Sequence, residues 1–233
     1  MSEWLRRDRD DCGSATHLTV RDNGDVHIRS DRSYALFWQI PRRDGTAMDL
    51  DPEQFKWLRK CDRPPMDFNN EIESRGAENL LEVTDTPWFS WRWKVDVATV
   101  KEQRLEGNGK LKSKYDDFPA KIGISILKKG STDLREVAYV WSRHLDDGMM
   151  FWSETTIIPL IWKLKWGRFV AESGTRAMGR WVSESRNVYD DYRKMYPDEE
   201  PGRIVRIYVS TDSDNTDSES EASYADFRFS VEP

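Results

Sequence analysis

Hydrophobic and polar residues alternate with a period of two along most of this chain. Around residues 89–97, Trp91, Trp93 and Val95 would share one face, and mostly charged residues would share the other. Such alternation is typical of β-strands with one buried face. It recurs near residues 18–28, 34–40, 80–83, 121–127, 136–142, 160–166, 204–210 and 224–231. Short turns separate several of these segments, so the pattern predicts a mainly all-β chain folded as an antiparallel β-sandwich of jelly-roll type.

Two short helices interrupt the strands in this prediction. Asp51 is a suitable N-cap, a proline follows it in the first turn, and Phe55 and Leu58 would lie on one helix face. The second helix covers residues 186–196, where apolar side chains recur with helical spacing before Pro197.

The chain divides unevenly between ordered and irregular segments. Residues 1–16 are charged and contain Gly and Ser, so we expect a flexible N-terminal segment. Residues 41–79 read as an irregular excursion that includes the first helix. Neither a linker nor a repeat divides the remainder, and we therefore expect one sandwich domain over residues 17–233.

Composition narrows the classes of function. The formal net charge is -6 and no basic run occurs, so the chain is poorly suited to nucleic acid. No stretch approaches the roughly 20 apolar residues of a membrane helix. The first residues lack the apolar segment of a signal peptide, and we therefore expect a cytoplasmic protein.

Cysteine, histidine and glycine motifs exclude several chemistries. Cys12 and Cys61 could pair, but two distant cysteines are no disulfide framework, and free thiols are the favoured interpretation. His17, His27 and His144 have no ligand spacing to one another. The chain has neither a Gly-x-Ser-x-Gly elbow nor a phosphate-binding glycine loop, so we expect no nucleotide or organic cofactor.

The acidic loop that starts at Asp212 is the sharpest local signal for a metal. Asp212, Asp214 and Asn215 supply the closely spaced oxygen ligands that calcium prefers. The EF-hand pattern fails, because the sixth position is Asp217 rather than Gly. The alternative is a solvated loop whose Asp and Asn side chains shape tight turns.

Basic residues suggest a place for an acidic small ligand. Arg92 and Lys94 lie on the polar face of a strand that we expect to be central. Arg186 and Asn187 could join them around a carboxylate or an acidic sugar. The alternative is that this face meets solvent and its charges serve solubility.

Carboxylates and tryptophans suggest a glycan. Asp117 with Glu172, or Asp117 with Asp212, could perform acid/base work on a glycosidic bond if their segments meet; ion pairing and turn formation are the alternative. Five of the 11 tryptophans alternate with polar residues as core side chains do, and we expect at least four of them in the core: Trp91, Trp93, Trp141, Trp162 and Trp166. Trp88, Trp152 and Trp181 lie nearer to loops and are better candidates for stacking on a sugar ring.

Several ordered motifs resemble one bacterial family. They are Trp91-Arg92-Trp93-Lys94-Val95, Asp116-Asp117-Phe118-Pro119, Tyr139-Val140-Trp141-Ser142, Glu172-Ser173-Gly174, Arg186-Asn187-Val188-Tyr189, Thr211-Asp212-Ser213-Asp214-Asn215-Thr216 and Ala222-Ser223-Tyr224.

The series is similar to the uncharacterised family called domain of unknown function 3047, over residues 80–229. The resemblance implies a sandwich like those of galactose-binding and carbohydrate-binding modules, and no established activity. Members often carry a signal peptide, which we do not expect in this chain, and a Gly where Asp217 stands here.

Three functions follow from these observations. The favoured one is a module that binds a glycan or similar polar ligand, stabilised by calcium. A second is a glycan hydrolase or lyase that uses carboxylates on one sheet face. A third is a structural or assembly subunit that meets a protein partner through residues 41–79.

Overall fold

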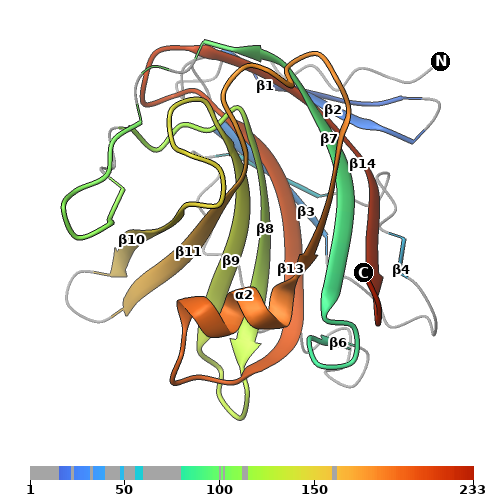
Figure 1. The fold of residues 1–233 in the computed structure, drawn as a ribbon, viewed down its shortest axis with the longest axis vertical. Coiled ribbons are helices and arrows are strands. Elements are labelled where there is room, and N and C mark those ends of the chain that lie inside the picture. Colours follow the sequence, from blue (N-terminus) through green and yellow to red (C-terminus); the bar gives the residue numbers. More distant parts are fainter. Residues whose placement is uncertain are drawn as a thin grey trace.

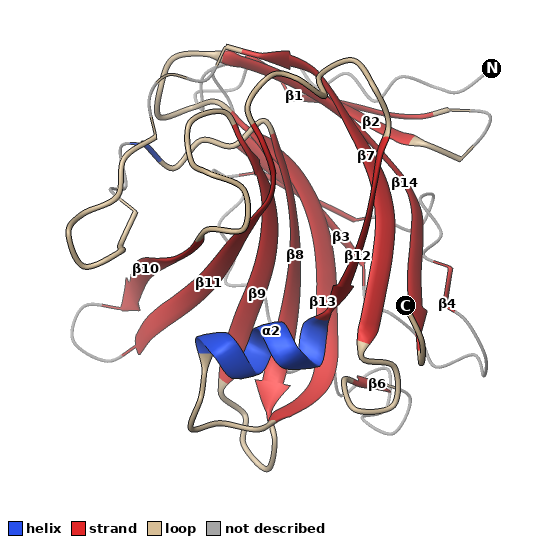
Figure 2. Cartoon of the chain, in the orientation of Figure 1, coloured by secondary structure: helices blue, strands red, loops and turns tan. Residues whose placement is uncertain are grey.

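Two β-sheets stack face to face in the computed structural model (Figures 1 and 2). It describes residues 16–21, 24–31, 34–39, 48–49, 56–59, 80–99, 101, 103–111, 115–158 and 162–233. The first sheet, sheet A, has the order β1 (Thr16–Val20), β2 (Val26–Asp31), β14 (Glu219–Ser230), β7 (Trp88–Ala98) and β12 (Val182–Asn187), with β4 (Met48–Asp49) also paired to β14.

The second sheet, sheet B, is larger. Its order is β10 (Met150–Ile158), β11 (Trp162–Ser173), β9 (Leu134–Ser142), β8 (Ala120–Lys128), β13 (Pro201–Asp212), β3 (Tyr34–Gln39) and β5 (Lys56–Arg59), with β6 (Leu81–Glu82) also paired to β13. The expected β-sandwich is therefore confirmed. No helix among the described residues is long and apolar enough to cross a membrane.

The apolar face of each sheet forms the core between them. Trp91, Trp93 and Trp141 are almost fully buried, as the alternation predicted. The ring of Trp91 lies 5.0 Å from that of Tyr139 in the other sheet, and the rings of Trp93 and Trp141 lie 5.8 Å apart. Each aromatic side chain removes a large apolar area from water, so these contacts between the sheets dominate the packing.

One strand pair departs from the predicted antiparallel arrangement. β9 and β11 run parallel, with Tyr139 opposite Phe169, whereas every other described pair of named strands is antiparallel. The order of the strands explains this pairing. After β9 the chain forms β10 at the edge of the sheet, and then turns back as β11, which lies between β10 and β9. β11 is antiparallel to β10 and therefore runs parallel to β9.

The two predicted helices have different outcomes. α2 (Val188–Met195) confirms the second, although β12 continues through Asn187, which caps the helix. The first is wrong at residues 56–59, because β5 pairs antiparallel with β3. An open strand edge at β3 outweighs a weak local helix preference.

The excursion at residues 41–79 contributes to both sheets. β4 extends sheet A and β5 extends sheet B, so these parts are regular rather than irregular. Cys12, Cys61 and residues 1–15 of the flexible segment expected at residues 1–16 lie outside the described residues, while Thr16 begins β1.

α2 covers part of the inner face of sheet B (Figure 1). Val188, Tyr192 and Met195 join the main core. Gly167 of β11 permits the close approach, since a Cβ there would lie 2.6 Å from the Met195 side chain. The helix and β12 therefore occupy the side of the sandwich where sheet A does not cover sheet B.

Candidate functional site

Strand β12, at the edge of sheet A, turns two charged side chains toward the interior. Glu184 lies opposite Trp91 of β7, and Arg186 lies opposite Phe89. Residues directly opposite in an antiparallel pair share a face of the sheet. Because Trp91 and Phe89 face the core, Glu184 and Arg186 do so too, and both are half-buried.

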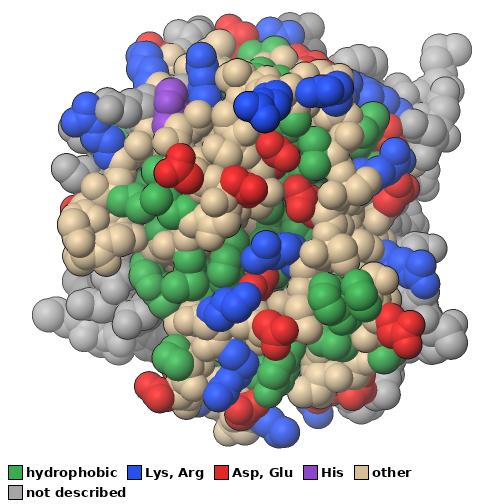
Figure 3. All heavy atoms as spheres, in the orientation of Figure 1, with side chains coloured by type: hydrophobic (Ala, Val, Ile, Leu, Met, Phe, Trp, Pro, Cys, Tyr) green, Lys and Arg blue, Asp and Glu red, His purple; other side chains and the backbone are tan. Residues whose placement is uncertain are grey.

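A β-bulge directs Glu172 of β11 to the same side of its own sheet as the core. The register of β11 against β9 shifts at Ala171, so that Glu172 lies opposite Trp141. Bulges commonly re-aim a side chain in this way. We call the set of Glu172, Glu184 and Arg186 the open-side site. Figure 3 shows acidic side chains gathered in the upper middle of the face that carries α2.

Electrostatics at this site favour a protonated glutamate. Burial raises the pKa of Glu184, the charges of Glu172 and Asp147 raise it further, and Arg186 opposes them; the result is about 7. Among the described residues, neither Glu172 nor Glu184 forms an ion pair with Lys or Arg. Glu184 can therefore either accept or donate a hydrogen bond near neutral pH.

Arg186 is held rigidly by α2. Its Nη2 lies 2.9 Å from Oδ2 of Asp191, and its Nε donates to the same oxygen at 3.0 Å. The Tyr139 hydroxyl donates to that oxygen as well, at 3.2 Å. The guanidinium stacks over the rings of Tyr139 and Phe169, at 5.5 and 5.3 Å. Its charge is thus already balanced.

A cavity of about 350 Å³ opens at the C-terminal end of α2. Trp152 lines it, together with Arg135, Tyr196 and Glu199. Arg135 is fixed by two hydrogen bonds of 2.7 Å to the Glu199 carboxylate. Its volume lies at the lower end of the range of small-ligand sites, and its wall combines the rings of Trp152 and Tyr196 with charged groups.

Arg92 and Lys94 lie on the outer face of sheet A and do not meet Arg186. Arg92 pairs with Asp226 and stacks over Trp181 at 5.1 Å. Lys94 Nζ lies 2.9 Å from Asp96 Oδ2. Since each cation already has an aspartate, this arrangement does not favour an acidic ligand.

Asp117 stabilises the acidic loop, and Asn187 caps the N-terminus of α2. The fully buried Asp117 carboxylate accepts hydrogen bonds from the backbone N–H groups of Asn215 and Thr216, at 3.1 and 2.7 Å, and from the Thr216 hydroxyl at 2.5 Å. The Asn187 side chain accepts from Asp190 N–H at 3.0 Å as the cap of α2. Asp117 therefore anchors the acidic loop.

The acidic loop brings three carboxylates together. Asp117, Asp212 and Asp214 each place one oxygen within 4.8 Å of the other two. Of the three residues predicted as calcium ligands, Asp212 and Asp214 belong to this cluster. Asp117 is its third member, and Asn215, whose side chain is exposed, is not part of it. Oδ1 of the buried Asp212 has no hydrogen-bond partner, and its Oδ2 lies 3.7 Å from Lys121 Nζ.

Neighbouring carboxylates and burial both act against ionisation of Asp212. Burial raises the pKa of Asp212 well above its ordinary range; the Lys121 ammonium opposes this, and Asp117 and Asp214 add to it. A hard cation would satisfy the orphan oxygen and offset this repulsion, so the donor set fits calcium.

A further cluster of polar side chains lies on the outer face of sheet B, and its members pair with one another. Glu136 accepts from the Tyr208 hydroxyl at 2.6 Å and lies 3.6 Å from Arg206 Nη2. Arg206 Nε also donates to the Ser125 hydroxyl at 3.0 Å. These groups are buried and satisfy one another, which indicates a structural role.

The fold and these sites define a β-sandwich protein with an ionisable cluster at its open side. The chain belongs to the family described as protein of unknown function DUF3047, whose sequence model matches residues 74–228. That match confirms the resemblance inferred over residues 80–229. A comparison with curated proteins finds no match.

Two solved structures are similar to this chain at low identity. The xyloglucanase domain of NopAA, a type three effector from Sinorhizobium fredii in complex with cellobiose, is 8% identical, with a TM-score of 0.41, and the match covers 97% of this chain and 92% of that chain. A mutant of ENZbleach xylanase is 7% identical, with a TM-score of 0.30, over 97% and 83% of the two chains. At these TM-scores the likeness carries no conclusion about function.

Proposed function

We propose that this protein binds a neutral glycan or a similar polyhydroxylated ligand at the open-side site. The observation that carries the proposal is the pair of carboxylates, Glu172 and Glu184, on the core-facing sides of β11 and β12. Among the described residues, neither forms an ion pair with Lys or Arg. Sugar hydroxyls donate strong hydrogen bonds to carboxylates. An acidic ligand is disfavoured, because Arg92, Lys94 and Arg186 all pair with aspartates.

The cavity beside Trp152 supports a second contact for the same ligand. Its volume suits one sugar ring, and the indole of Trp152 offers an apolar wall for stacking. α2 connects the two places, because it starts two residues after Arg186 and its last residue, Met195, lines the cavity.

A glycan array followed by calorimetry of the best oligosaccharide tests this proposal. Glu184→Gln keeps the size of the side chain but removes its charge, and should weaken binding at least tenfold, since a hydrogen bond to a charged group contributes about 1.5–3 kcal/mol. Glu232→Gln, an exposed change near the C-terminus, is the matched control. The competing explanation is that inward charges only protect the strand edge from pairing with other chains; equal binding by both variants would favour it.

We further propose that calcium stabilises the acidic loop through Asp117, Asp212 and Asp214. Support comes from the orphan oxygen of Asp212 and from the carboxylates around it. Thermal unfolding in EDTA and in calcium tests this, and an unchanged melting temperature contradicts it.

Glycan hydrolysis is the second candidate, and the pKa of Glu184 near 7 favours it. A protonated carboxyl beside an ionised one is the acid/base pair that glycosidic cleavage uses. Release of reducing sugar, measured from pH 5 to 9, should then fall as Glu184 ionises, and Glu184→Gln should abolish it. Absence of turnover on every glycan that binds would leave the binding module. The assembly alternative through residues 41–79 and the cytoplasmic location stay predictions.

A further inference from the structure

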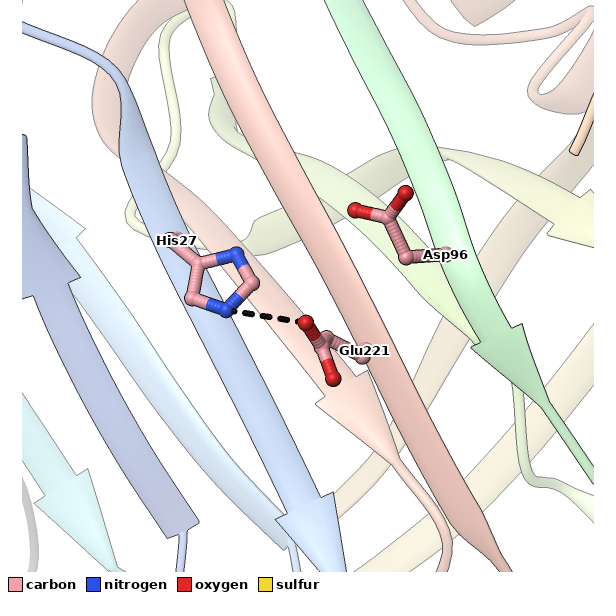
Figure 4. Close-up of side chains that lie close together, drawn as sticks. All are labelled: His27, Asp96 and Glu221. Atoms are coloured by element: carbon pink, nitrogen blue, oxygen red, sulfur yellow. Dashed lines mark ion pairs between the residues drawn. The ribbon is translucent and has the colours of Figure 1, made fainter. Parts of the chain in front are cut away.

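Three strands of sheet A bring His27, Asp96 and Glu221 together on its outer face (Figure 4). They come from β2, β7 and β14, and each offers one ligand atom within 4.8 Å of the other two. Two ligands that bind one zinc ion at about 2.1 Å lie at most about 4.2 Å apart. Small side-chain rotations would therefore place all three around a single ion.

The register of the sheet builds this cluster. His27 of β2 lies directly opposite Ser223 of β14. Glu221 is two residues from Ser223 along β14 and therefore lies on the same face of the sheet. Between β14 and β7, Glu221 pairs with Val97 but Ala222 pairs with Val95, so Asp96 is the extra residue of a β-bulge. Because a bulge re-aims a side chain, Asp96 turns toward the other two.

The imidazole of His27 is already oriented as a ligand. Its Nδ1 is hydrogen-bonded to the Ser223 hydroxyl at 3.0 Å, while Nε2 lies 3.2 Å from Oε1 of Glu221. Metal-binding histidines commonly use one ring nitrogen for such a supporting bond and the other for the ion.

We propose that His27, Asp96 and Glu221 form a binding site for a divalent first-row transition metal ion such as zinc. One imidazole and two carboxylates suit ions of this class better than calcium, which prefers oxygen ligands alone. The three side chains are partly covered, with 11% of His27, 25% of Glu221 and 26% of Asp96 exposed, so the ion keeps open positions for water or a ligand. This site is independent of the glycan site and of the acidic loop.

Lys94 governs occupancy in this arrangement. Its ammonium lies 2.9 Å from Asp96 Oδ2 and balances that carboxylate when no metal is bound. A zinc ion bound to Asp96 must displace the Lys94 ammonium, because the two positive charges would repel each other at this short distance. Lys94→Met keeps the length of the side chain and removes the competing charge, and it should therefore tighten metal binding.

Zinc calorimetry on the full chain, with Cys12 and Cys61 both replaced by Ser, tests the proposal. One zinc per chain should bind; His27→Gln and Glu221→Gln should each weaken binding at least tenfold, and Lys94→Met should strengthen it severalfold. His144→Gln, at an exposed histidine outside the cluster, is the matched control and should change nothing.

The visible absorption spectrum of bound cobalt provides a second measurement, independent of the binding heat that calorimetry detects. A visible band that disappears in Glu221→Gln supports ligation, and circular dichroism verifies that each variant is folded. Zinc affinity that is the same in His27→Gln and the parent, or no binding by the parent, would overturn the proposal and leave His27–Glu221 and Lys94–Asp96 as surface ion pairs. An effect of Asp212→Asn on zinc affinity would also overturn it, by assigning the zinc to the acidic loop.

Discussion

Glu184→Gln should make the protein more stable at alkaline pH while impairing its ligand binding. The pKa of Glu184 is about 7 in the folded protein, against an ordinary value of 4.5. Below pH 4.5 the group is protonated in both states and contributes nothing. Between pH 4.5 and 7 the unfolded chain loses the proton and the folded protein keeps it, so the free energy of unfolding falls; above 7 the penalty is constant.

The magnitude follows from the difference between the two pKa values, about 2.5. Each unit of pKa corresponds to about 1.4 kcal/mol, which would give about 3.5 kcal/mol without screening by solvent. Glu184 is only partly shielded from water, so we expect about 2 kcal/mol. Glutamine carries no charge and avoids this penalty, and the melting temperature at pH 8 should rise by about 4–8 °C.

Thermal unfolding of Glu184→Gln and of the parent at pH 4 and pH 8 provides the assay. The gain should be present at pH 8 and absent at pH 4, and Glu232→Gln should show neither effect. A gain of equal size at both pH values would refute the electrostatic reasoning. A loss of stability at pH 8 would show that the Glu184 carboxylate holds the fold together rather than straining it.

Three other substitutions test the surrounding structure. Asp117→Asn should lower the free energy of unfolding by about 2–4 kcal/mol in urea, since the amide cannot replace all the charge-assisted bonds to Asn215 and Thr216; a change below about 0.5 kcal/mol would contradict that role. Asp212→Asn should abolish any calcium-dependent rise in melting temperature and leave the metal-free protein equally or more stable, as scanning calorimetry can establish. Gly123→Ala should prevent folding or cost several kcal/mol, because the added Cβ would lie 2.1 Å from the Tyr208 ring; a normal far-ultraviolet spectrum and melting temperature would refute this packing.

The period-two pattern was sufficient for the sandwich because each sheet has one face in a common core. It placed Trp91, Trp93 and Trp141 correctly. It failed at residues 56–59, where the partner strand β3 decides the conformation and local spacing does not. The parallel pairing of β11 with β9 likewise depends on the order of strands in space, which no local pattern carries.

The candidate site was predicted only in part. Glu172 and Arg186 were expected as ligand residues, but Glu184 was missed because Arg186 was assigned to the second helix. The alternation of Val182, Glu184 and Arg186 would have indicated a strand through residue 186. What no spacing reveals is that this polar face turns inward.

Register between distant strands explains the remaining omissions. His27, Asp96 and Glu221 are far apart in the sequence, so spacing along the chain excluded a histidine-containing metal site that the sheet nevertheless brings together. Asp117 was expected to meet Glu172 or Asp212, and its carboxylate does lie beside Asp212. Its hydrogen bonds to backbone N–H groups of the acidic loop agree with the turn-forming role that the sequence offered as the alternative.

Ligand binding at the open-side site is most directly tested by titrating the best oligosaccharide from a glycan array into the parent protein and Glu184→Gln at pH 7. The account predicts saturable binding by the parent and at least a tenfold loss in the variant, although the variant is as stable or more stable. Equal affinity of the two proteins, or no saturable binding of any glycan by the parent, would contradict it.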